Sequence, residues 1–332
     1  MEGINENKNY FVDGDFIIRQ KLTNTFLKNY FTRKVAYLIE FFCRSIILNF
    51  YNCFFRKKMQ FKNKVSICAM FKNEAEFLNE WINFHLNIGV DYFYLYNNNS
   101  NDGFRDILEP YIKEGLVELI DWPYDNSLMQ AFEDCYKKNR FSTNWLAYID
   151  IDEFICPIVH DNIKSWLSGY DNLPGVAVYW KQFGSNGKLT HNTDQLVIEQ
   201  YTQCWPKYST FTKMFCNMNY PISNFLTPHY LKSKIWNFDI SPCNEYKKMI
   251  SFGINKIATN RQSSIQINHY WGKAFDRFQD KLNRSDSVYS DSKRMMQIRK
   301  NLLKSHEAMC TDRDYTIQKY LLYTKLKNIL KE

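Results

Sequence analysis

The sequence lacks any CxxC pair, although it contains nine cysteines among its 332 residues. These cysteines are scattered and odd in number, which argues against a disulfide framework and a thiolate zinc site and fits a reducing compartment. Internal repeats and low-complexity segments are also missing, and 45% hydrophobic and 17% aromatic residues can form a real core. Wholesale disorder is therefore excluded, and the length allows one large domain or two ordinary ones.

No small-residue cleavage site follows the longest apolar run, Val35 to Phe55, and the run begins too late for a cleavable signal. Its 21 residues would just span a bilayer, but Glu40 and Arg44 lie inside it, where each charge is costly. Basic residues flank both of its ends. We therefore predict an interfacial helix attracted to anionic lipid, with a helix packed on the body and a true membrane span as alternatives.

The centre of the chain has no net positive charge. Residues 1–64 carry a net charge of +7 and residues 293–332 carry +6, whereas residues 65–292 carry −5. A nucleic-acid binder is expected to place its positive charge on the folded body, so we predict no nucleic-acid partner. A membrane surface fits better. We predict a cytoplasmic protein, peripheral to the inner face of the membrane, held there by two basic arms at 1–63 and 291–332.

Between the arms, strand and helix patterns alternate four times. Apolar runs of strand length lie at 65–71, 91–96, 116–122 and 144–157. Apolar residues at helical spacing separate them, and this alternation is typical of a parallel sheet with helices on its faces. Beyond residue 158 the regularity loosens. Two further strands are predicted there, at 175–188, ending in a glycine loop, and at 196–205.

The fourth run, NWLAYIDIDEFICP, contains Asp150, Asp152 and Glu153. Carboxylates are rare in so apolar a segment without a partner, because desolvating an unpaired charge is costly. Ligands of open α/β sheets bind at the carboxyl ends of the strands, and the period of two puts Asp150 and Asp152 on one side. Two negative charges ~6 Å apart repel by ~3 kcal/mol at an effective dielectric of about 20, which a divalent cation would remove. We predict Mn²⁺ or Mg²⁺ there; the alternative is that Asp150 or Glu153 caps a helix or pairs with a lysine.

Four blocks carry a resemblance to a known family. They are VSICAMFKNEAEFLNEWINFHLNIGVDYFYLYNNNSNDG, WLAYIDIDEF, YWKQFGSNGK…LVIEQY and INHYWGKAFDRFQDKLNR. Their order and approximate spacing resemble glycosyltransferase family 92 and related glycosyltransferase-2-like sequences, over about residues 64–290. The resemblance implies a GT-A fold: an α/β fold with a Rossmann-like, mostly parallel central sheet and flanking helices. It also implies a nucleotide-sugar half at 64–157, an acceptor half at 158–290 and one metal ion.

The resemblance implies roles for single residues. Asp150 would face the ribose or a metal-bound water, and Asp152 would ligate the metal. Glu153 would orient the pair, and His269 would be a further metal ligand unless it is a structural histidine. The residues expected to contact the nucleotide sugar, besides Asp150, are Lys72, Asn73, Glu74, Asn97, Asn99, Asp102, Gly184, Gly187, Lys281 and Arg284. A plain turn at 97–103 and a solvated helix face for the last two are the alternatives.

A Glu-Asp pair, which many proteins of this fold use as the catalytic base, is missing from the expected region. Glu199, Asp239 and Glu245 are the candidate bases, and Glu199 is favoured because it follows the glycine loop in a matched block. We predict an inverting, metal-dependent hexosyltransferase that uses a UDP-sugar such as UDP-galactose. Its acceptor would be a glycan or a lipid-linked glycan in cell-surface polysaccharide or lipopolysaccharide synthesis.

Two other functions keep the fold and change the chemistry. A nucleotidyl- or sugar-phosphate transferase usually carries a glycine-rich phosphate loop after the first strand, and AMFKNEAEF has no glycine. A non-catalytic, membrane-attached scaffold would have no need of buried acids.

Overall fold

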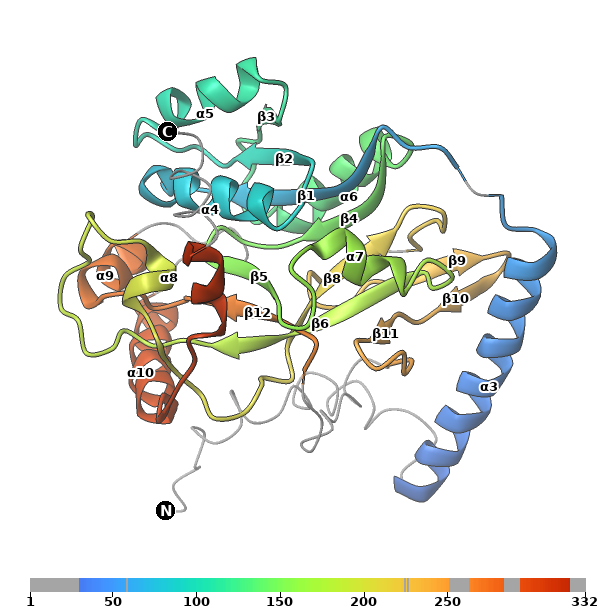
Figure 1. Cartoon of the computed structure of the whole chain (residues 1–332). Coiled ribbons are helices and arrows are strands. Elements are labelled where there is room, and N and C mark those ends of the chain that lie inside the picture. The colour runs from blue at the N-terminus through green and yellow to red at the C-terminus, as the bar shows by residue number, and fades with distance from the viewer. Residues whose placement is uncertain are drawn as a thin grey trace.

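The computed structural model describes residues 30–57, 59–223, 225, 227–250, 263–283 and 293–322. The first half of the body alternates strands and helices, as the sequence predicts. These elements are β1 (Asn63–Phe71), α4 (Ala75–Asn87), β2 (Tyr92–Asn97), α5 (Phe104–Lys113), β3 (Val117–Asp121), α6 (Leu128–Asn139) and β4 (Thr143–Tyr148). The strands lie in the order β3, β2, β1, β4 and all pair in parallel (Figure 1).

β1 lies in the middle of these parallel strands, and every residue from Val65 to Phe71 is buried. Alternate side chains enter two different cores. Val65 and Ile67 pack in the core that contains residues of α4 and α5, whereas Cys68 and Met70 pack in the core that contains residues of α6. Because helices cover both faces, the buried stretch is apolar except for Ser66, instead of alternating between apolar and polar residues.

The second half of the body extends the same sheet. Its elements are β5 (Glu153–Pro157), α7 (Ile163–Ser168), β6 (Gly175–Gln182), α8 (Val197–Gln200), β7 (Gln203–Cys204), β8 (Thr212–Asn217), β9 (Ser233–Ile235), β10 (Phe238–Ile240), β11 (Cys243–Asn244) and β12 (Ile265–His269). β8 is antiparallel to both β4 and β6, and β12 is parallel to β6 and antiparallel to β5. The strand order is β3-β2-β1-β4-β8-β6-β12-β5, with β11 beside β6. The predicted α/β fold with a mostly parallel central sheet and flanking helices is confirmed.

The predicted strand at 144–157 is two strands. β4 ends at Tyr148, the chain turns, and β5 begins at Glu153 and pairs with β12 instead of β4. The backbone N–H of Glu153 donates to the carbonyl of Asp150 over 3.1 Å and closes this turn. Asp150 and Asp152 therefore lie in a turn between two strands, and Glu153 begins the second strand.

The predicted strand at 196–205 is also wrong. The chain forms the short helix α8 there, followed by the two-residue strand β7. The carboxylate of Glu80, on α4, accepts hydrogen bonds from the backbone N–H groups of Val197 (2.8 Å) and Ile198 (3.2 Å). Glu80 thus satisfies the first donors of α8, a tertiary contact that a strand pattern in the sequence cannot reveal.

The N-terminal helix α3 (Tyr30–Phe54) packs with one face against the β9–β10 hairpin (Figure 1). Leu48 is buried there with Ile235 and Ile240, and Arg44 donates to Ser241 Oγ over 3.3 Å. Part of the predicted interfacial helix therefore packs on the body. Among the described residues, no helix has the length and apolar character required to cross a membrane.

The described C-terminal residues also pack on the body. They form α9 (Phe275–Asn283), α10 (Lys293–Met309), β13 (Asp312–Arg313) and the 3-10 helix η2 (Thr316–Gln318). β13 pairs with β7, and the hydroxyl of Tyr320 donates to the carbonyl of Pro157 over 2.8 Å. His306 on α10 is buried, with Nε2 2.9 Å from the carbonyl oxygen of Phe183.

Candidate active site

The turn between β4 and β5 carries the three predicted acids, and a buried lysine holds two of them. Lys213 on β8 is inaccessible to solvent; its Nζ lies 2.7 Å from Asp150 Oδ2 and 3.3 Å from Glu153 Oε1. This is the lysine pairing that the sequence left open as the alternative. The prediction that Asp150 and Asp152 project from one side of a strand is wrong, because the chain turns between them.

Asp152 faces a different set of side chains. Its Oδ1 lies 3.7 Å from Nε2 of His269, and its Oδ2 accepts a 2.5 Å hydrogen bond from Nζ of Lys281 on α9. Glu153 and His269 are directly opposed in the antiparallel pair of β5 and β12, so their side chains lie on the same face of the sheet. One ligand atom from each of Asp152, Glu153 and His269 lies within 4.8 Å of the other two.

In this cluster, Asp152–Glu153–His269, the spacing of Asp152 and His269 fits a divalent cation. Two ligands of one ion, each ~2.1 Å from it, lie ~3.0–4.2 Å apart, and the 3.7 Å between Asp152 and His269 falls within that range. Burial lowers the pKa of His269 to about 3, so its imidazole is neutral near pH 7 and can donate a lone pair. Its Nδ1 is buried without a hydrogen-bond partner among the described residues.

The charges around the cluster differ in their effect on its two acids. Burial by itself would raise the pKa of Asp152, but Lys281, His269 and Lys273 hold it well below the ordinary value. Burial raises the pKa of Glu153, and Lys213 opposes that rise. Asp152 is therefore ionised at neutral pH, and the ammonium of Lys281 balances its charge.

An aromatic wall fixes the orientation of the imidazole. The ring of Trp180, on β6, lies against that of His269 with a centroid distance of 4.2 Å and an interplanar angle of 34°. The same indole lies 5.8 Å from Nζ of Lys213, on the other side of the acid turn. Trp180 thus contacts both the lysine that holds Asp150 and the histidine of the cluster.

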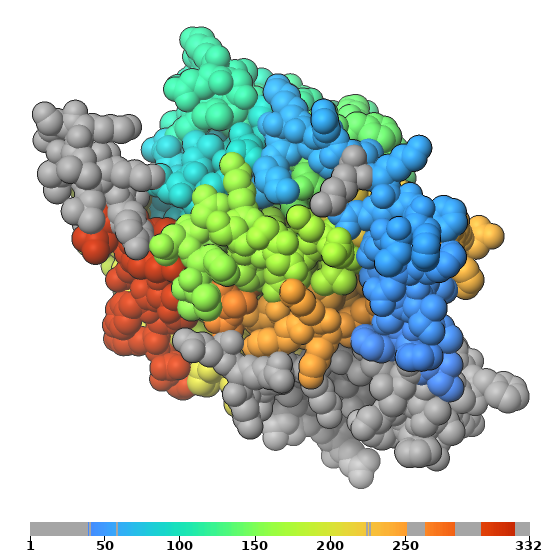
Figure 2. Space-filling view, turned by 45° about the vertical axis from the view of Figure 1, so that its right-hand side comes forward, coloured from blue at the N-terminus to red at the C-terminus, as the bar shows by residue number. Residues whose placement is uncertain are grey.

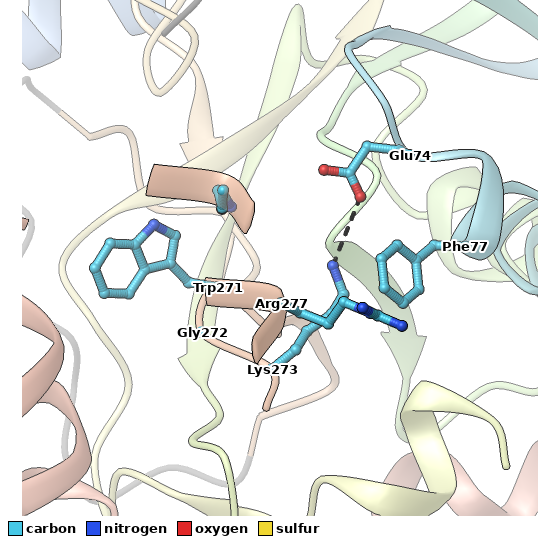
Figure 3. A pocket seen from close by; sticks show the side chains of 7 residues that line it. Glu74, Phe77, Trp271, Gly272, Lys273 and Arg277 are labelled. Atoms are coloured by element: carbon cyan, nitrogen blue, oxygen red, sulfur yellow. Dashed lines mark ion pairs between the residues drawn. The ribbon is translucent and has the colours of Figure 1, made fainter. Parts of the chain in front are cut away.

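A small pocket opens next to Lys281, between the start of α4 and the β12–α9 loop (Figure 3). It is lined by Glu74, Phe77, Trp271, Gly272, Lys273, Arg277 and Lys281. Lys273 is buried, with its Nζ 3.8 Å from Glu74 Oε2 and 3.9 Å from the centre of the Phe77 ring. Three of the lining side chains are cationic, and each lies within 4 Å of a carboxylate: Lys273 of Glu74, Arg277 of Glu76 and Lys281 of Asp152.

The profile of glycosyltransferase family 92 matches residues 63–291. The chain belongs to glycosyltransferase family 92. Curated relatives include a family 92 protein of Oryza sativa subsp. japonica, 26% identical over 249 residues, and one of Arabidopsis thaliana, 26% identical over 247 residues. The matches cover 72% and 70% of this chain but only 38% and 39% of those relatives, so the chain spans less than half of their length.

Among solved structures, the chain is similar to the crystal structure of residues 1–349 of S. aureus TarS. The TM-score is 0.30 at 14% sequence identity, over 39% of this chain and 38% of that one. A structure of the same TarS fragment in complex with UDP has a TM-score of 0.30 at 13% identity, with the same coverage.

Within the family 92 match, the predicted residues after β1 and β2 meet at one edge of the sheet. Asn73 Oδ1 accepts from the N–H of Asn101 (2.8 Å), and Asn97 Nδ2 donates to Asp121 (2.9 Å). Asp102 accepts from the N–H of Ala75 over 2.8 Å and so caps α4. These side chains join the loops to one another, which is a structural role that the sequence alone did not reveal.

The other predicted contacts after these strands are Lys72, Glu74 and Asn99. Lys72 is half-buried, and Asn99 is exposed with a φ of +56°, as the turn alternative expects. Glu74 lines the pocket together with Lys281. Sequence reasoning missed the pocket residues Lys273 and Arg277, although both lie in the last of the family 92 blocks.

The glycine loop after β6 has a packing explanation. A Cβ on Gly184 would lie 2.7 Å from Sγ of Cys310, and the hydroxyl of the next residue, Ser185, donates to Glu307 over 2.7 Å. Gly187 has a φ of +73°, in the left-handed region that favours glycine. The loop therefore fits against the C-terminal segment. Arg284, which is also predicted to bind the donor, lies outside the described residues.

The structure gives each predicted base a partner. Glu199 accepts from the N–H of Leu196 (3.2 Å) at the start of α8, and Asp239 pairs with Lys234 (3.5 Å) in the β9–β10 hairpin. Glu245 accepts from the N–H of Ser264 over 2.6 Å, next to the first residue of β12. His269 ends that strand, so the Cα atoms of Ser264 and His269 lie roughly 16 Å apart at a rise of ~3.3 Å per residue. Glu245, which contacts Ser264, is therefore at the far end of β12 from His269. None of the three bases is among the described residues that line the pocket.

Proposed function

We propose that this family 92 chain is a glycosyltransferase that moves a hexose from a nucleotide sugar to a glycan acceptor, with the help of Mn²⁺ or Mg²⁺. The observation that carries the proposal is the Asp152–Glu153–His269 cluster, whose ligand atoms lie within 4.8 Å of one another, beside a pocket lined by cationic side chains. A cation and basic groups can together neutralise the charge of a nucleoside diphosphate. Family membership supports the class of reaction.

In this proposal Asp152 and His269 would hold the cation, and Glu153 would complete the protein ligands. When bound, the cation would neutralise charge that develops on the departing nucleoside diphosphate. Lys281 would leave Asp152 and turn its flexible side chain toward the donor phosphates. Lys273 and Arg277 would contribute further positive charge from the pocket wall.

The finer assignments are part of the same proposal. We propose a UDP-sugar such as UDP-galactose as the donor, and a growing cell-surface polysaccharide or lipopolysaccharide, free or lipid-linked, as the acceptor. An inverting transfer requires a carboxylate that accepts the proton of the acceptor hydroxyl. Glu199, Asp239 and Glu245 remain predictions for this role. Separate replacement by the matching amide, followed by turnover and unfolding measurements, would distinguish a base from a structural acid.

The test uses Asp152→Asn and His269→Ala, with Asp161→Asn as the control. Asp161 is 70% exposed and pairs with Lys319, so Asp161→Asn should change neither Mn²⁺ binding nor the release of UDP from UDP-galactose. We expect both cluster variants to bind Mn²⁺ at least about tenfold more weakly by calorimetry, because each removes one ligand of the same ion. Both should also lose release of UDP from UDP-galactose. Turnover by Asp152→Asn equal to that of the wild type would contradict the assignment.

Products identify the reaction class in the same experiment. Glycosyl transfer releases UDP and adds a hexose to the acceptor, whereas sugar-phosphate transfer releases UMP, and nucleotidyl transfer consumes a nucleoside triphosphate and releases pyrophosphate. Mass spectrometry of the products separates the three. A chain that binds neither Mn²⁺ nor any nucleotide sugar would be the non-catalytic scaffold instead.

A further inference from the structure

The helix α3 has two apolar faces, and the part of the body that the structure describes covers one of them. Leu48 is buried against β9 and β10, whereas Ile39, Phe42, Ile46, Phe50 and Phe54 are 50–72% exposed. At about 100° per residue, each of these five points within about 60° of the direction opposite Leu48. A helix packed on a globular body by one face normally carries polar residues on the other. Figure 2 shows α3 running along one edge of the molecule.

The hairpin beneath α3 extends this apolar face. Trp236 lies between β9 and β10, is 48% exposed, and has its ring centroid 6.3 Å from that of Phe50. We call Ile39, Phe42, Ile46, Phe50, Phe54 and Trp236 the α3 surface. Aromatic side chains present ~150–250 Å² each when fully exposed, so the α3 surface amounts to roughly 500 Å² of apolar area. The largest apolar patch of a typical monomer is about 300–600 Å² and is often functional.

Charge indicates what covers the α3 surface. Lys57 is exposed just beyond the end of α3, and Lys234, 46% exposed, is two residues from Trp236. The first 64 residues carry a net charge of +7. A second copy docked through the same face would bring these like charges together, whereas an anionic membrane carries the opposite charge.

We propose that the α3 surface docks on an anionic lipid bilayer, with α3 lying in the plane of the interface. Apolar side chains enter the acyl boundary, the indole of Trp236 lies at headgroup level, and Lys57 and Lys234 contact lipid phosphates. In Figure 1, α3 lies at the opposite end of the molecule from α9, which carries Lys281. Docking therefore leaves the candidate active site open, and it is independent of the proposed transfer reaction.

The test is cosedimentation of the full chain with vesicles of phosphatidylcholine, alone or mixed with phosphatidylserine. The variant is Phe42→Ser/Phe50→Ser/Trp236→Ser, and the control is Phe141→Ser/Val159→Ser/Leu189→Ser, whose three residues are 65–75% exposed and outside the α3 surface. We expect the wild type and the control to bind the mixed vesicles, less so at high salt. The α3 variant should bind at least about tenfold more weakly, at an unchanged melting temperature.

A second variant keeps the test decisive if the first one is unstable. Lys57→Glu/Lys234→Glu reverses two exposed charges and breaks only the exposed pair of Lys234 with Asp239, and it should lower binding to the mixed vesicles by about tenfold. Equal vesicle binding by the wild type and both variants would overturn the proposal, as would no binding by the wild type. A wild-type dimer that the α3 variant converts to a monomer, seen by sedimentation equilibrium, would assign the surface to a second copy and also overturn it.

Discussion

The ammonium of Lys281 lies 2.5 Å from Oδ2 of Asp152, although the two residues come from the last helix of the family match and from the turn after β4. A cation on Asp152 and this ammonium compete for one carboxylate. Their competition gives the first prediction, because removal of the lysine should strengthen the binding of Mn²⁺ and weaken the binding of the nucleotide sugar.

Lys281→Met should bind Mn²⁺ about five- to tenfold more tightly without donor, since an ion pair of roughly 1 kcal/mol no longer opposes the metal. The same variant should have a KM for the nucleotide sugar about tenfold higher, because a phosphate contact is lost. Calorimetry and initial rates measure the two effects. The control is Lys113→Met on α5, whose side chain is 72% exposed and pairs with Glu109. Weaker Mn²⁺ binding by Lys281→Met would contradict the competition.

Lys213 gives a prediction about stability. It is fully buried between Asp150 and Glu153, so Lys213→Met leaves a carboxylate buried without its partner and should lower the free energy of unfolding by about 3 kcal/mol. The double variant Lys213→Met/Glu153→Gln should recover part of this loss. Lys234→Met, which breaks the exposed pair with Asp239, should change stability by less than about 1 kcal/mol. Urea unfolding of the four proteins is the measurement, and equal losses for Lys213→Met and Lys234→Met would show that the buried pairing adds nothing.

Gly184 distinguishes two explanations for the glycine loop, close packing on Cys310 and close approach of the sugar. Gly184→Ala would place its Cβ 2.7 Å from Cys310 Sγ and should cost about 1–3 kcal/mol of stability, with the KM for the donor unchanged. The matched control is Gly169→Ala, where the nearest atom lies at an ordinary 3.5 Å and no loss is expected. Thermal unfolding and donor titration distinguish the outcomes. A raised KM with unchanged stability would support the predicted approach of the sugar instead.

Glu80 makes stability depend on pH. Burial raises its pKa from 4.5 to about 7, against the two N–H groups of α8 that lower it. Between pH 4.5 and 7 the folded chain therefore binds more protons than the unfolded chain, so stability falls as pH rises through this range and levels off above it. The contribution is about 3 kcal/mol. Glu80→Gln should remove this slope, which urea unfolding at pH 5, 6 and 7 measures; an unaltered slope would exclude Glu80 as its source.

The elements that the sequence predicts well are those with local signals. Parallel strands β1 to β4 and their helices follow from apolar periodicity, because each pattern lies within one short segment. The sequence also places Asp152 and His269 in one predicted site, and the structure brings their side chains to 3.7 Å from each other. The pairing of β5 with β12, which opposes Glu153 to His269, joins segments far apart in the chain. No local pattern encodes that contact.

The lysine at the centre of the acid turn could not be predicted for a similar reason. Lys213 lies in a strand, β8, that sequence analysis did not identify, and a buried lysine has no signature without its partners. The turn at Asp150–Asp152 was missed because the apolar run continues on both sides of it, as it would in one strand. Local composition cannot distinguish one continuous strand from two successive strands that pair with different neighbours.

The opposition of Glu153 and His269 on a single rung of the β5–β12 ladder also bears on redesign of the protein. Backbone hydrogen bonds between the strands determine the separation of these two residues. Changes in loops that make no backbone hydrogen bond to β5 or β12 should therefore leave this pair at its spacing, whereas the loop after β6 holds it, because the N–H of Phe183 donates to the carbonyl of His269 over 3.0 Å. Substitutions that shift the strand register by one residue would instead separate the two side chains onto opposite faces.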